Sequence, residues 1–519
     1  MIVKVSIKKG RYYDSVTLMI ISGELNRMEG IISSSVVMGT AGNKAILASA
    51  GLMTEELTGA GDSDLIISVH ALSEQAAVSA INKTDELFRE LRKQGDEDIG
   101  KKARTLGDAL LQMPGANLSL ISVAGKYAAA EAMKALQKGL HVMIFSDNVP
   151  IEEELALKQH AHERGLLVMG PDCGTAIING IPLGFANAVG RGGIGIVAAS
   201  GTGLQEVASV ISAGGTGISQ AIGTGGRDIK REIGGIMFLD AMKALAAHAE
   251  TKVIVLVSKP PHREVVDRIA EEIRHSAKPV VTILIGGDAE SLKDAGAITA
   301  QTLEEAGMLA VAISMDDDPA TVQRTLAQRS EWLDVLAGSH AGGRNGRFLR
   351  GLFSGGTLCD EAQLVLKKTL GFVYSNTPLH PDYQIQGTEP GRGDCIIDMG
   401  DDAFTVGRPH PMIDYSTRNR RIMEETADRE VAVILLDIVL GYGSHPDPAS
   451  ELAPVIRKAC EDFPGILFIG SVTGTDGDPQ DRRRVIRELE AAGMVIMPSN
   501  AAAAELAGKI ILQIRSKKT

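Results

Sequence analysis

This chain of 519 residues is poor in several kinds of residue, and each shortage excludes a class of protein. Its four cysteines lie far apart and form no Cys-x-x-Cys pair, so neither a disulfide scaffold nor a zinc knuckle is indicated. Aromatic residues make up 3% of the chain, with a single Trp332, which argues against platforms for base stacking. This cysteine usage predicts a reducing, cytoplasmic location.

Long apolar runs and positive charge are also lacking. No apolar run approaches the roughly 20 residues that span a bilayer, and the first residues lack the apolar core of a signal peptide. The net charge of -12 and the pI of about 5.5 disfavour nucleic acids and anionic membranes as partners. Small anions can still bind at helix starts and single arginines, so a small anionic substrate is expected.

What is present is an α/β pattern. With 44% hydrophobic residues, the chain is long enough for about three domains. From Leu118 onward, buried strands alternate with helical segments, which predicts parallel, doubly wound sheets. The strands are expected at 118–123, 140–145, 166–169, 194–198, 252–258 and 279–285, and the helices at 128–138, 151–164, 204–213 and 262–276.

A glycine-rich stretch at 338–346 is interpreted as a linker, after which the pattern restarts. Strands are expected near 348–353, 395–399, 431–440 and 466–472. Residues 1–115 form a separate α/β segment with strands at 3–7, 32–38 and 65–70 and helices at 14–26 and 74–92. No chemistry is assigned to this segment, and it is expected to be a partner or oligomer surface.

Two stretches repeat one device, an apolar strand that breaks at a Ser-Gly turn before a helix. The turns are Ser200-Gly201-Thr202 and Ser354-Gly355-Gly356-Thr357. Glycine allows a tight turn, and the helix start offers unpaired N–H groups and the positive end of its dipole. One such turn can be a simple N-cap, but the pair predicts a phosphate held from both sides.

Other polar loops follow predicted strands, where open α/β sheets bind ligands. Gly225 and Gly226 are expected to bind phosphate together with the two Ser-Gly turns. The other candidate ligand residues are Asp147, Asn148, Asp172, Cys173, Thr473 and Thr475. Cys173 is more simply a packed small residue than a nucleophile, because no histidine partner is near it in the sequence. The adjacent Asp401 and Asp402 are read as a solvated turn, and no metal site is predicted.

The order of these loops resembles the succinyl-CoA synthetase superfamily from about Leu118 to the end, and within it the FdrA family. The resemblance is carried by Asp172-Cys173-Gly174-Thr175, Gly226-Arg227-Asp228, Ser258-Lys259-Pro260-Pro261 and the stretch from Val406 to Asp414. It implies a Rossmann-like CoA-binding-type domain at 116–190. Two flavodoxin-like domains would follow, resembling the synthetase alpha subunit at 191–337 and its beta subunit at 347–519.

The chain departs from the synthetase pattern at the catalytic histidine. Asp294 in Lys293-Asp294-Ala295-Gly296-Ala297 stands where the family has its phosphohistidine, and Lys259 falls at the position of the supporting glutamate. His340 lies in the predicted linker and is not expected to replace the carrier. The ATP-grasp half of the beta subunit has no counterpart. These departures disfavour acyl-CoA synthesis through a phosphoenzyme.

The resemblance to the FdrA family implies a carbamoyltransferase, in which oxalurate and phosphate give oxamate and carbamoyl phosphate. Arg227, Arg408 and His410 would hold the substrate carboxylate and the developing oxyanion, and Lys259 would add positive charge. The alternatives in which these residues have only structural roles are a surface ion pair between Arg227 and Asp228 and a structural loop around Arg408 and His410. No cofactor is required in this interpretation, whereas CoA binding stays open.

Partner subunits and a homo-oligomer are expected with this activity. Two other functions remain open at this point. One is an acyl-CoA synthetase or other CoA-binding enzyme, and the other is a non-catalytic scaffold subunit.

Overall fold

The computed structural model describes residues 2–11, 13, 15–40, 43–44, 47–48, 51–96, 103, 105–287, 289–344, 346–386, 389–405 and 409–517. Two compact units make up the chain. Unit 1 combines Met1–Ala116 with Asp402–His410, and unit 2 combines Asn117–Asp401 with Pro411–Thr519. None of the helices in the described ranges is long and apolar enough to cross a membrane.

Unit 1 contains a three-stranded antiparallel sheet in the order β1-β3-β2. Its elements are β1 (Ile2–Lys8), α1 (Ser15–Asn26), β2 (Ile31–Met38), η1 (Glu55–Leu57), β3 (Leu65–Ala71), α3 (Glu74–Asp96) and α4 (Leu106–Gln112). Apolar residues cover both faces of the sheet: Ile21 and Leu25 belong to one cluster, and Leu52 and Leu57 to another. The three strands and two helices expected here are confirmed.

Unit 2 begins with a small parallel sheet in the order β4-β5-β6. Its elements are β4 (Leu118–Ile121), α5 (Gly125–Gln137), β5 (His141–Ile144), α6 (Ile151–His162) and β6 (Val168–Met169). This segment has the strands and helices predicted from Leu118 onward.

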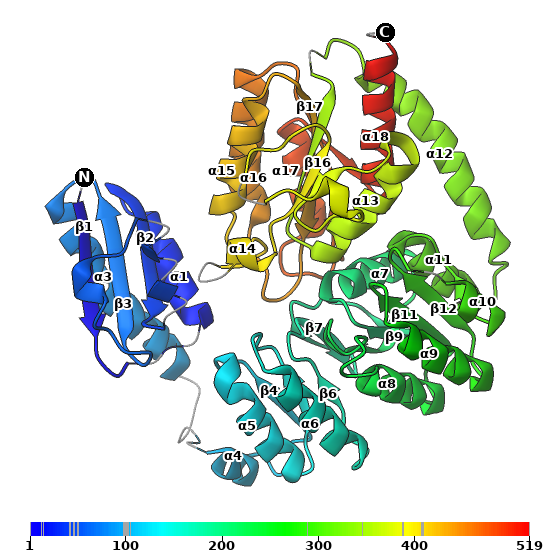
Figure 1. Cartoon of the computed structure of the whole chain (residues 1–519), viewed down its shortest axis with the longest axis horizontal. Coiled ribbons are helices and arrows are strands. Elements are labelled where there is room, and N and C mark those ends of the chain that lie inside the picture. Colours follow the sequence, from blue (N-terminus) through cyan, green and yellow to red (C-terminus); the bar gives the residue numbers. More distant parts are fainter. Residues whose placement is uncertain are drawn as a thin grey trace. The chain divides into compact units, whose positions relative to one another are not determined.

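A seven-stranded sheet follows, in the order β13-β12-β11-β9-β10-β7-β8. In Figure 1, α8 and α9 lie along this green part of the chain, with α7 and α11 beside the same strands. The elements are β7 (Thr175–Ile178), β8 (Ile181–Gly184), β9 (Arg191–Ala198), α7 (Gly201–Ala213), β10 (Ile218–Gly223), α8 (Ile236–Ala247), β11 (Val253–Ser258), α9 (Arg263–His275), β12 (Val280–Leu284), α10 (Glu290–Asp294), β13 (Ile298–Thr299) and α11 (Leu303–Ser314).

Two strands of this sheet depart from the parallel arrangement that the sequence predicts. β7 and β8 form an antiparallel hairpin, and β7 also pairs antiparallel with β10. The turn between them is Asn179-Gly180, and both residues have positive φ. Asn-Gly is the pair that a tight hairpin turn favours, so the sequence carried a signal for this hairpin.

The last sheet has six strands in the order β15-β16-β14-β17-β18-β19, all parallel. Its elements are β14 (Phe348–Phe353), α13 (Gly356–Leu370), β15 (Tyr374–Ser375), η2 (Pro381–Tyr383), β16 (Cys395–Asp398), α15 (Ser416–Thr426), β17 (Val431–Val439), α16 (Pro448–Asp462), β18 (Leu467–Thr473), α17 (Arg482–Ala491), β19 (Met494–Met497) and α18 (Asn500–Ser516). The short helix α14 (Asp402–Thr405) interrupts this series.

The connection between the two large sheets differs from the predicted linker at 338–346, because a helix occupies the first part of that stretch. α12 (Ala320–His340) continues through the first residues of the 338–346 stretch, so His340 is helical. Ala337 and Leu333 on this helix are buried, and packing of this apolar face extends the helix into a glycine-rich sequence. The segment between the sheets is therefore shorter than predicted.

The two large sheets share one strand order. Strands β13, β12, β11, β9 and β10 of the first correspond to β19, β18, β17, β14 and β16 of the second. α7 follows β9 as α13 follows β14, and the last helices, α11 and α18, also correspond. We refer to residues 191–314 and 346–517 as the first and second halves of this duplication.

Candidate functional site

The two Ser-Gly turns meet directly. Ser200 caps α7 by accepting a hydrogen bond from Gly203 N at 3.0 Å, and its hydroxyl is hydrogen-bonded to the hydroxyl of Thr357 at 2.5 Å. A Cβ added at Gly203 would lie 3.1 Å from the Thr357 methyl, and one added at Gly355 would lie 3.0 Å from Thr202 Cγ2. Glycine therefore lets the starts of α7 and α13 approach closely.

A buried aspartate shapes the second turn. Asp437, near the carboxyl end of β17, accepts hydrogen bonds from Ser354 N, Ser354 Oγ and Gly355 N at 2.7 to 2.9 Å. Arg418 Nη1 donates to the same carboxylate at 2.9 Å, and both partners of this ion pair are fully buried. The donors of Ser354 and Gly355 are thus already satisfied by protein, which leaves Gly356 as the partly exposed member of this turn.

Charged side chains surround the start of α13. Lys259, which follows β11, makes a 2.7 Å ion pair with Asp360, and their side chains are 42% and 12% exposed. Asp398 ends β16, and a Cβ added at Gly356 would lie only 2.6 Å from its Oδ2. Lys259 was predicted as a site residue, whereas no role was predicted for Asp360 or for Asp398, which lies in the strand predicted at 395–399.

Burial and neighbouring charge change the pKa values in this cluster. Burial raises the pKa of Asp398 to about 7, although Lys259 opposes this shift. Burial also raises the pKa of Asp360. For Lys259, burial lowers the pKa, but Asp360 and Asp398 outweigh burial and keep its pKa above the ordinary value. The cluster therefore combines a fixed cation with a carboxyl group that titrates near neutral pH.

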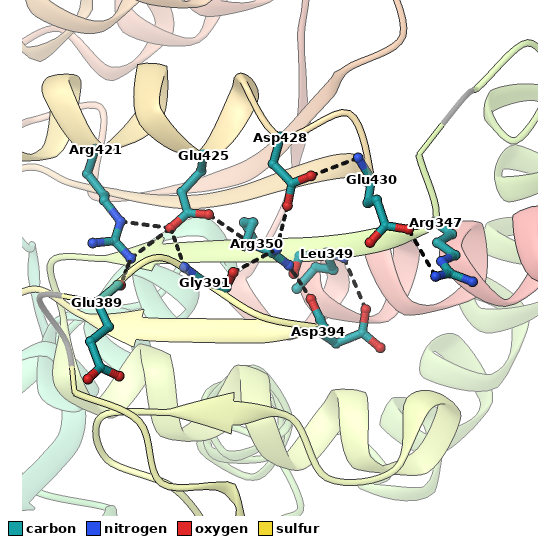
Figure 2. Close-up of polar contacts among 11 residues, drawn as sticks. Arg347, Leu349, Arg350, Glu389, Gly391, Asp394, Arg421, Glu425, Asp428 and Glu430 are labelled. Atoms are coloured by element: carbon teal, nitrogen blue, oxygen red, sulfur yellow. Dashed lines mark hydrogen bonds and ion pairs between the residues drawn. The ribbon is translucent and has the colours of Figure 1, made fainter.

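A buried arginine supports the strands that carry this cluster (Figure 2). Arg350 on β14 donates through Nε to Glu425 at 2.8 Å and through Nη2 to Gly391 O and Asp428, both at 3.1 Å. Its Nη1 donates to Gly393 O. Because the loop around Gly391 leads into β16, Arg350 anchors the strand that ends at Asp398.

The two halves also exchange helix caps. Glu206 on α7 accepts a hydrogen bond from Asn500 N, the first residue of α18, at 3.0 Å. Glu361 on α13 accepts one from Leu303 N, the first residue of α11, at 2.6 Å. Glu206 and Glu361 both lie six residues after their N-cap residues, so the two contacts are related by the duplication. Burial raises the pKa of Glu206, and burial with the nearby Glu206 raises that of Glu361 to about 8.

The structural alternative, an ion pair between Arg227 and Asp228, is wrong, because each residue pairs with another partner. Arg227 Nη2 donates to Val149 O and contacts Glu154 Oε2, both at 2.8 Å. Asp228 instead makes a 2.9 Å ion pair with Lys158 and accepts a hydrogen bond from Phe238 N near the start of α8. Part of the Arg227 guanidinium is therefore committed to the loop before α6.

The predicted ligand loops fall into two groups. Asp147, Asn148 and Asp172 are exposed, and Asp172 N donates to Ser146 O at 3.0 Å, so these two loops are adjacent. Cys173 beside them is buried, and burial raises the pKa of its thiol to about 12, as a packed residue requires. Gly225 has positive φ, and an added Cβ would lie 2.3 Å from Pro171 O, whereas Gly226 has more space.

Thr473 and Thr475 are buried, and their hydroxyl groups donate hydrogen bonds to acceptors within the protein. Thr473 donates to Glu206, and Thr475 donates to Ala188 O at 2.7 Å. Together with Ser354, they are left out of the site described below. Arg408 lies outside the described residues, and His410 belongs to unit 1. Within the described ranges, no group of three or more His, Cys, Asp or Glu side chains could hold a metal ion.

Family models match three parts of the chain. A CoA-ligase model matches residues 352–510, and a CoA binding domain model matches residues 191–286. The CoA-binding match lies within the first half of the duplication, whereas the CoA-binding-type domain was predicted at 116–190. The model of the AllF heavy metal-associated domain matches residues 1–105.

The residues of that last match do not fit a heavy metal. Residues 1–105 contain no cysteine and a single histidine, His70. Many sites for soft metal ions use thiolates, and this segment has no thiolate ligand to offer.

Curated relatives cover the whole chain or its middle. The chain is 41% identical to the uncharacterized protein YahF of Escherichia coli over 98% of this chain and 99% of that protein. It is 30% identical to succinate–CoA ligase subunit alpha 2 of Archaeoglobus fulgidus, over 41% of this chain and 79% of the subunit. The solved acetyl-coenzyme A synthetase 1 of Ca. Korarchaeum cryptofilum is 13% identical, with coverage of 78% and 83% and a TM-score of 0.34.

Proposed function

The chain belongs to the succinyl-CoA synthetase-like superfamily together with YahF, and from this membership we propose that it transfers a carbamoyl group between a ureido acid and phosphate. The observation that carries the proposal is the cluster around the meeting helix starts. In this cluster Lys259 supplies a positive charge, and the carboxyl group of Asp398 has a pKa of about 7. Both residues lie beside the turn that, by the resemblance, the superfamily uses for phosphate chemistry. Asp294, at the position of the family's phosphohistidine, ends the short helix α10.

Phosphate would bind at the exposed edge of the two helix starts. Ser200, Gly201, Thr202 and Gly356 are each partly exposed there. The first-turn N–H groups and the two dipoles attract an anion, each by about 0.3 to 2 kcal/mol. Lys259 adds a full positive charge, because Asp360 holds it in place and keeps it protonated.

The reaction would need no covalent relay. With oxalurate as the ureido acid, a phosphate oxygen attacks the terminal carbamoyl carbon, a new C–O bond forms, and the C–N bond to the oxamyl nitrogen breaks. The leaving nitrogen takes a proton from the Asp398 carboxyl group, and hydrogen phosphate returns one to it, so oxamate and carbamoyl phosphate result. A carboxyl pKa near 7 suits both directions of this transfer.

The role of positive charge at this site can be tested with two lysines that flank the same strand, β11. Lys259 follows the end of β11, and Lys252 immediately precedes its start and is exposed. The purified protein is incubated with oxalurate and phosphate, both alone and together with the proteins encoded by its neighbouring genes. Formation of carbamoyl phosphate is followed by phosphorus NMR. Lys259→Met should slow its formation by at least about tenfold, whereas Lys252→Met should not change it. Equal rates in the two variants would refute the role of Lys259.

A second candidate function, acyl-CoA formation, is favoured by the CoA-binding match at residues 191–286. It requires that CoA bind to the chain and that a nucleotide leave phosphate on the protein. Calorimetric titration with CoA, together with mass spectrometry of the chain after incubation with ATP, separates the two. Bound CoA with a phosphorylated side chain would support this second candidate against carbamoyl transfer.

A further inference from the structure

A cavity of about 350 Å³ lies between the two halves of the duplication. The first half contributes the later part of α7 and the facing side of α11, including Val210 and Met308. The second half contributes Val472 and Gly474 at the end of β18, and Pro498 after β19. The cavity therefore sits at the carboxyl edge of a parallel sheet, which is where open α/β folds bind small ligands.

Two buried carboxylates form one part of the lining. Glu206 is 2% exposed, and its two oxygens accept hydrogen bonds from Asn500 N and Thr473 Oγ1. Glu304 is 6% exposed, and its Oε1 accepts from Arg329. Its Oε2 is buried and has no hydrogen-bond partner among the described residues. A buried acceptor without a donor is costly, and an N–H group of a bound ligand would satisfy this oxygen. Arg329 Nε is also buried without a partner among the described residues, so Arg329 donates to Glu304 through Nη1 and not through Nε.

An arginine lines the same cavity. Arg482, the first residue of α17, is half-buried, and its Nε donates to Val472 O at 3.3 Å. Within the described residues it makes no ion pair. It is close enough to Glu206 to lower that carboxyl pKa against the effects of burial and Glu304. Its remaining N–H groups form a fork suited to a carboxylate.

We propose that this cavity binds a free α-amino acid, with the ammonium group at Glu304 and Glu206 and the carboxylate at Arg482. The carboxylates of Glu206 and Glu304 are balanced by the guanidinium groups of Arg482 and Arg329, so a zwitterion, which carries no net charge, keeps the charges of the cavity balanced. The apolar walls formed by Val210, Met308 and Val311 would receive the side chain. This site uses none of the residues of the proposed carbamoyl transfer site.

Isothermal titration calorimetry of the full chain tests the proposal with each of the standard L-amino acids at millimolar concentration. At least one should bind saturably. Its amide, which lacks the carboxylate, and its des-amino analogue, which lacks the ammonium group, should each bind at least about tenfold more weakly. Absence of binding by every amino acid, or equal binding of the des-amino analogue, would overturn the proposal.

Matched variants locate the binding. Glu304→Gln keeps the size of the side chain, and Arg482→Met removes the guanidinium; each should weaken binding by at least about tenfold. Arg483→Met is the control, because Arg483 is the next residue, is exposed and pairs with Asp476 instead. Thermal melting checks that each variant folds. Wild-type affinity in folded Glu304→Gln would overturn the assignment, even if Arg482→Met did not fold.

Discussion

At the scale of single residues, charged groups approach the start of α13 closely because Gly356 leaves room for them. Gly356 has no side chain, and the Asp398 carboxylate occupies the space where a Cβ would be. Asp437 satisfies the N–H groups just before it. The second Ser-Gly turn is thus fixed by two aspartates, Asp398 and Asp437, from the strands on either side of β14, and only its last part can take an external anion.

Gly356→Ala tests the approach of Asp398. Alanine normally stabilises a helix relative to glycine, but here its Cβ would lie 2.6 Å from Asp398 Oδ2. We expect a loss of about 1 to 3 kcal/mol in the free energy of unfolding, measured with urea. The control is Gly338→Ala in α12, where the nearest atom would be 3.5 Å away, and which should be neutral or stabilising. A stabilised Gly356→Ala variant would contradict the described geometry.

Asp437→Asn tests the buried ion pair behind the turn. The change leaves Arg418 without its buried counter-charge and should cost about 3 to 5 kcal/mol in the free energy of unfolding. Asp462→Asn breaks a 2.8 Å pair with Lys458 on the surface and should cost less than about 1 kcal/mol. Urea denaturation compares them, and equal losses would show that the turn does not depend on Asp437.

At the scale of elements, the two halves hold one another through the starts of their helices. α7 contributes a carboxylate to the start of α18, and α13 contributes one to the start of α11. An N-terminal cap satisfies backbone donors that the helix itself cannot pair. Because each cap comes from the opposite half, separation of the halves would expose both helix starts.

The pH dependence of stability reports on this exchange of caps. Glu361 has a pKa of about 8 in the folded chain against 4.5 for an ordinary glutamate. The folded state therefore keeps a proton that the unfolded state releases, and this group makes stability fall as the pH rises from about 4.5 to about 8. Glu361→Gln should make the fall in melting temperature shallower over this range, whereas the exposed Glu490→Gln should not. An unchanged slope in Glu361→Gln would contradict the raised pKa.

The elements also show what the sequence could predict. Runs of Val, Ile and Leu located β9, β11, β12, β14 and β17 correctly, since a strand buried on both faces needs a continuous apolar run. The central strand β10 was not predicted, because Ser219 and Gln220 interrupt its apolar residues. The strands β7, β8, β13, β15 and β19 were also missed, because each is only two to four residues long. The contact between Ser200 and Thr357 followed from two similar turns, but the roles of Asp360, Asp398 and Asp437 depend on neighbours distant in sequence.

At the scale of the whole molecule, the central claim is that a superfamily built for phosphate transfer handles phosphate here without a phosphohistidine. The duplicated halves keep the two facing helix starts, and Lys259 with Asp360 and Asp398 forms the charged cluster beside them. The resemblance puts Asp294 where the superfamily has its phosphohistidine, and direct attack by phosphate is therefore the proposed route.

The most direct test traces the oxygen atoms of phosphate. The protein, together with the proteins encoded by its neighbouring genes, is incubated with oxalurate and with phosphate that carries oxygen-18 in every position. The mass of the carbamoyl phosphate formed is then measured by mass spectrometry. Direct attack places a phosphate oxygen in the bridge, so the product should keep all the heavy oxygens of phosphate. A product that has lost one of them, or no carbamoyl phosphate at all, would contradict the account.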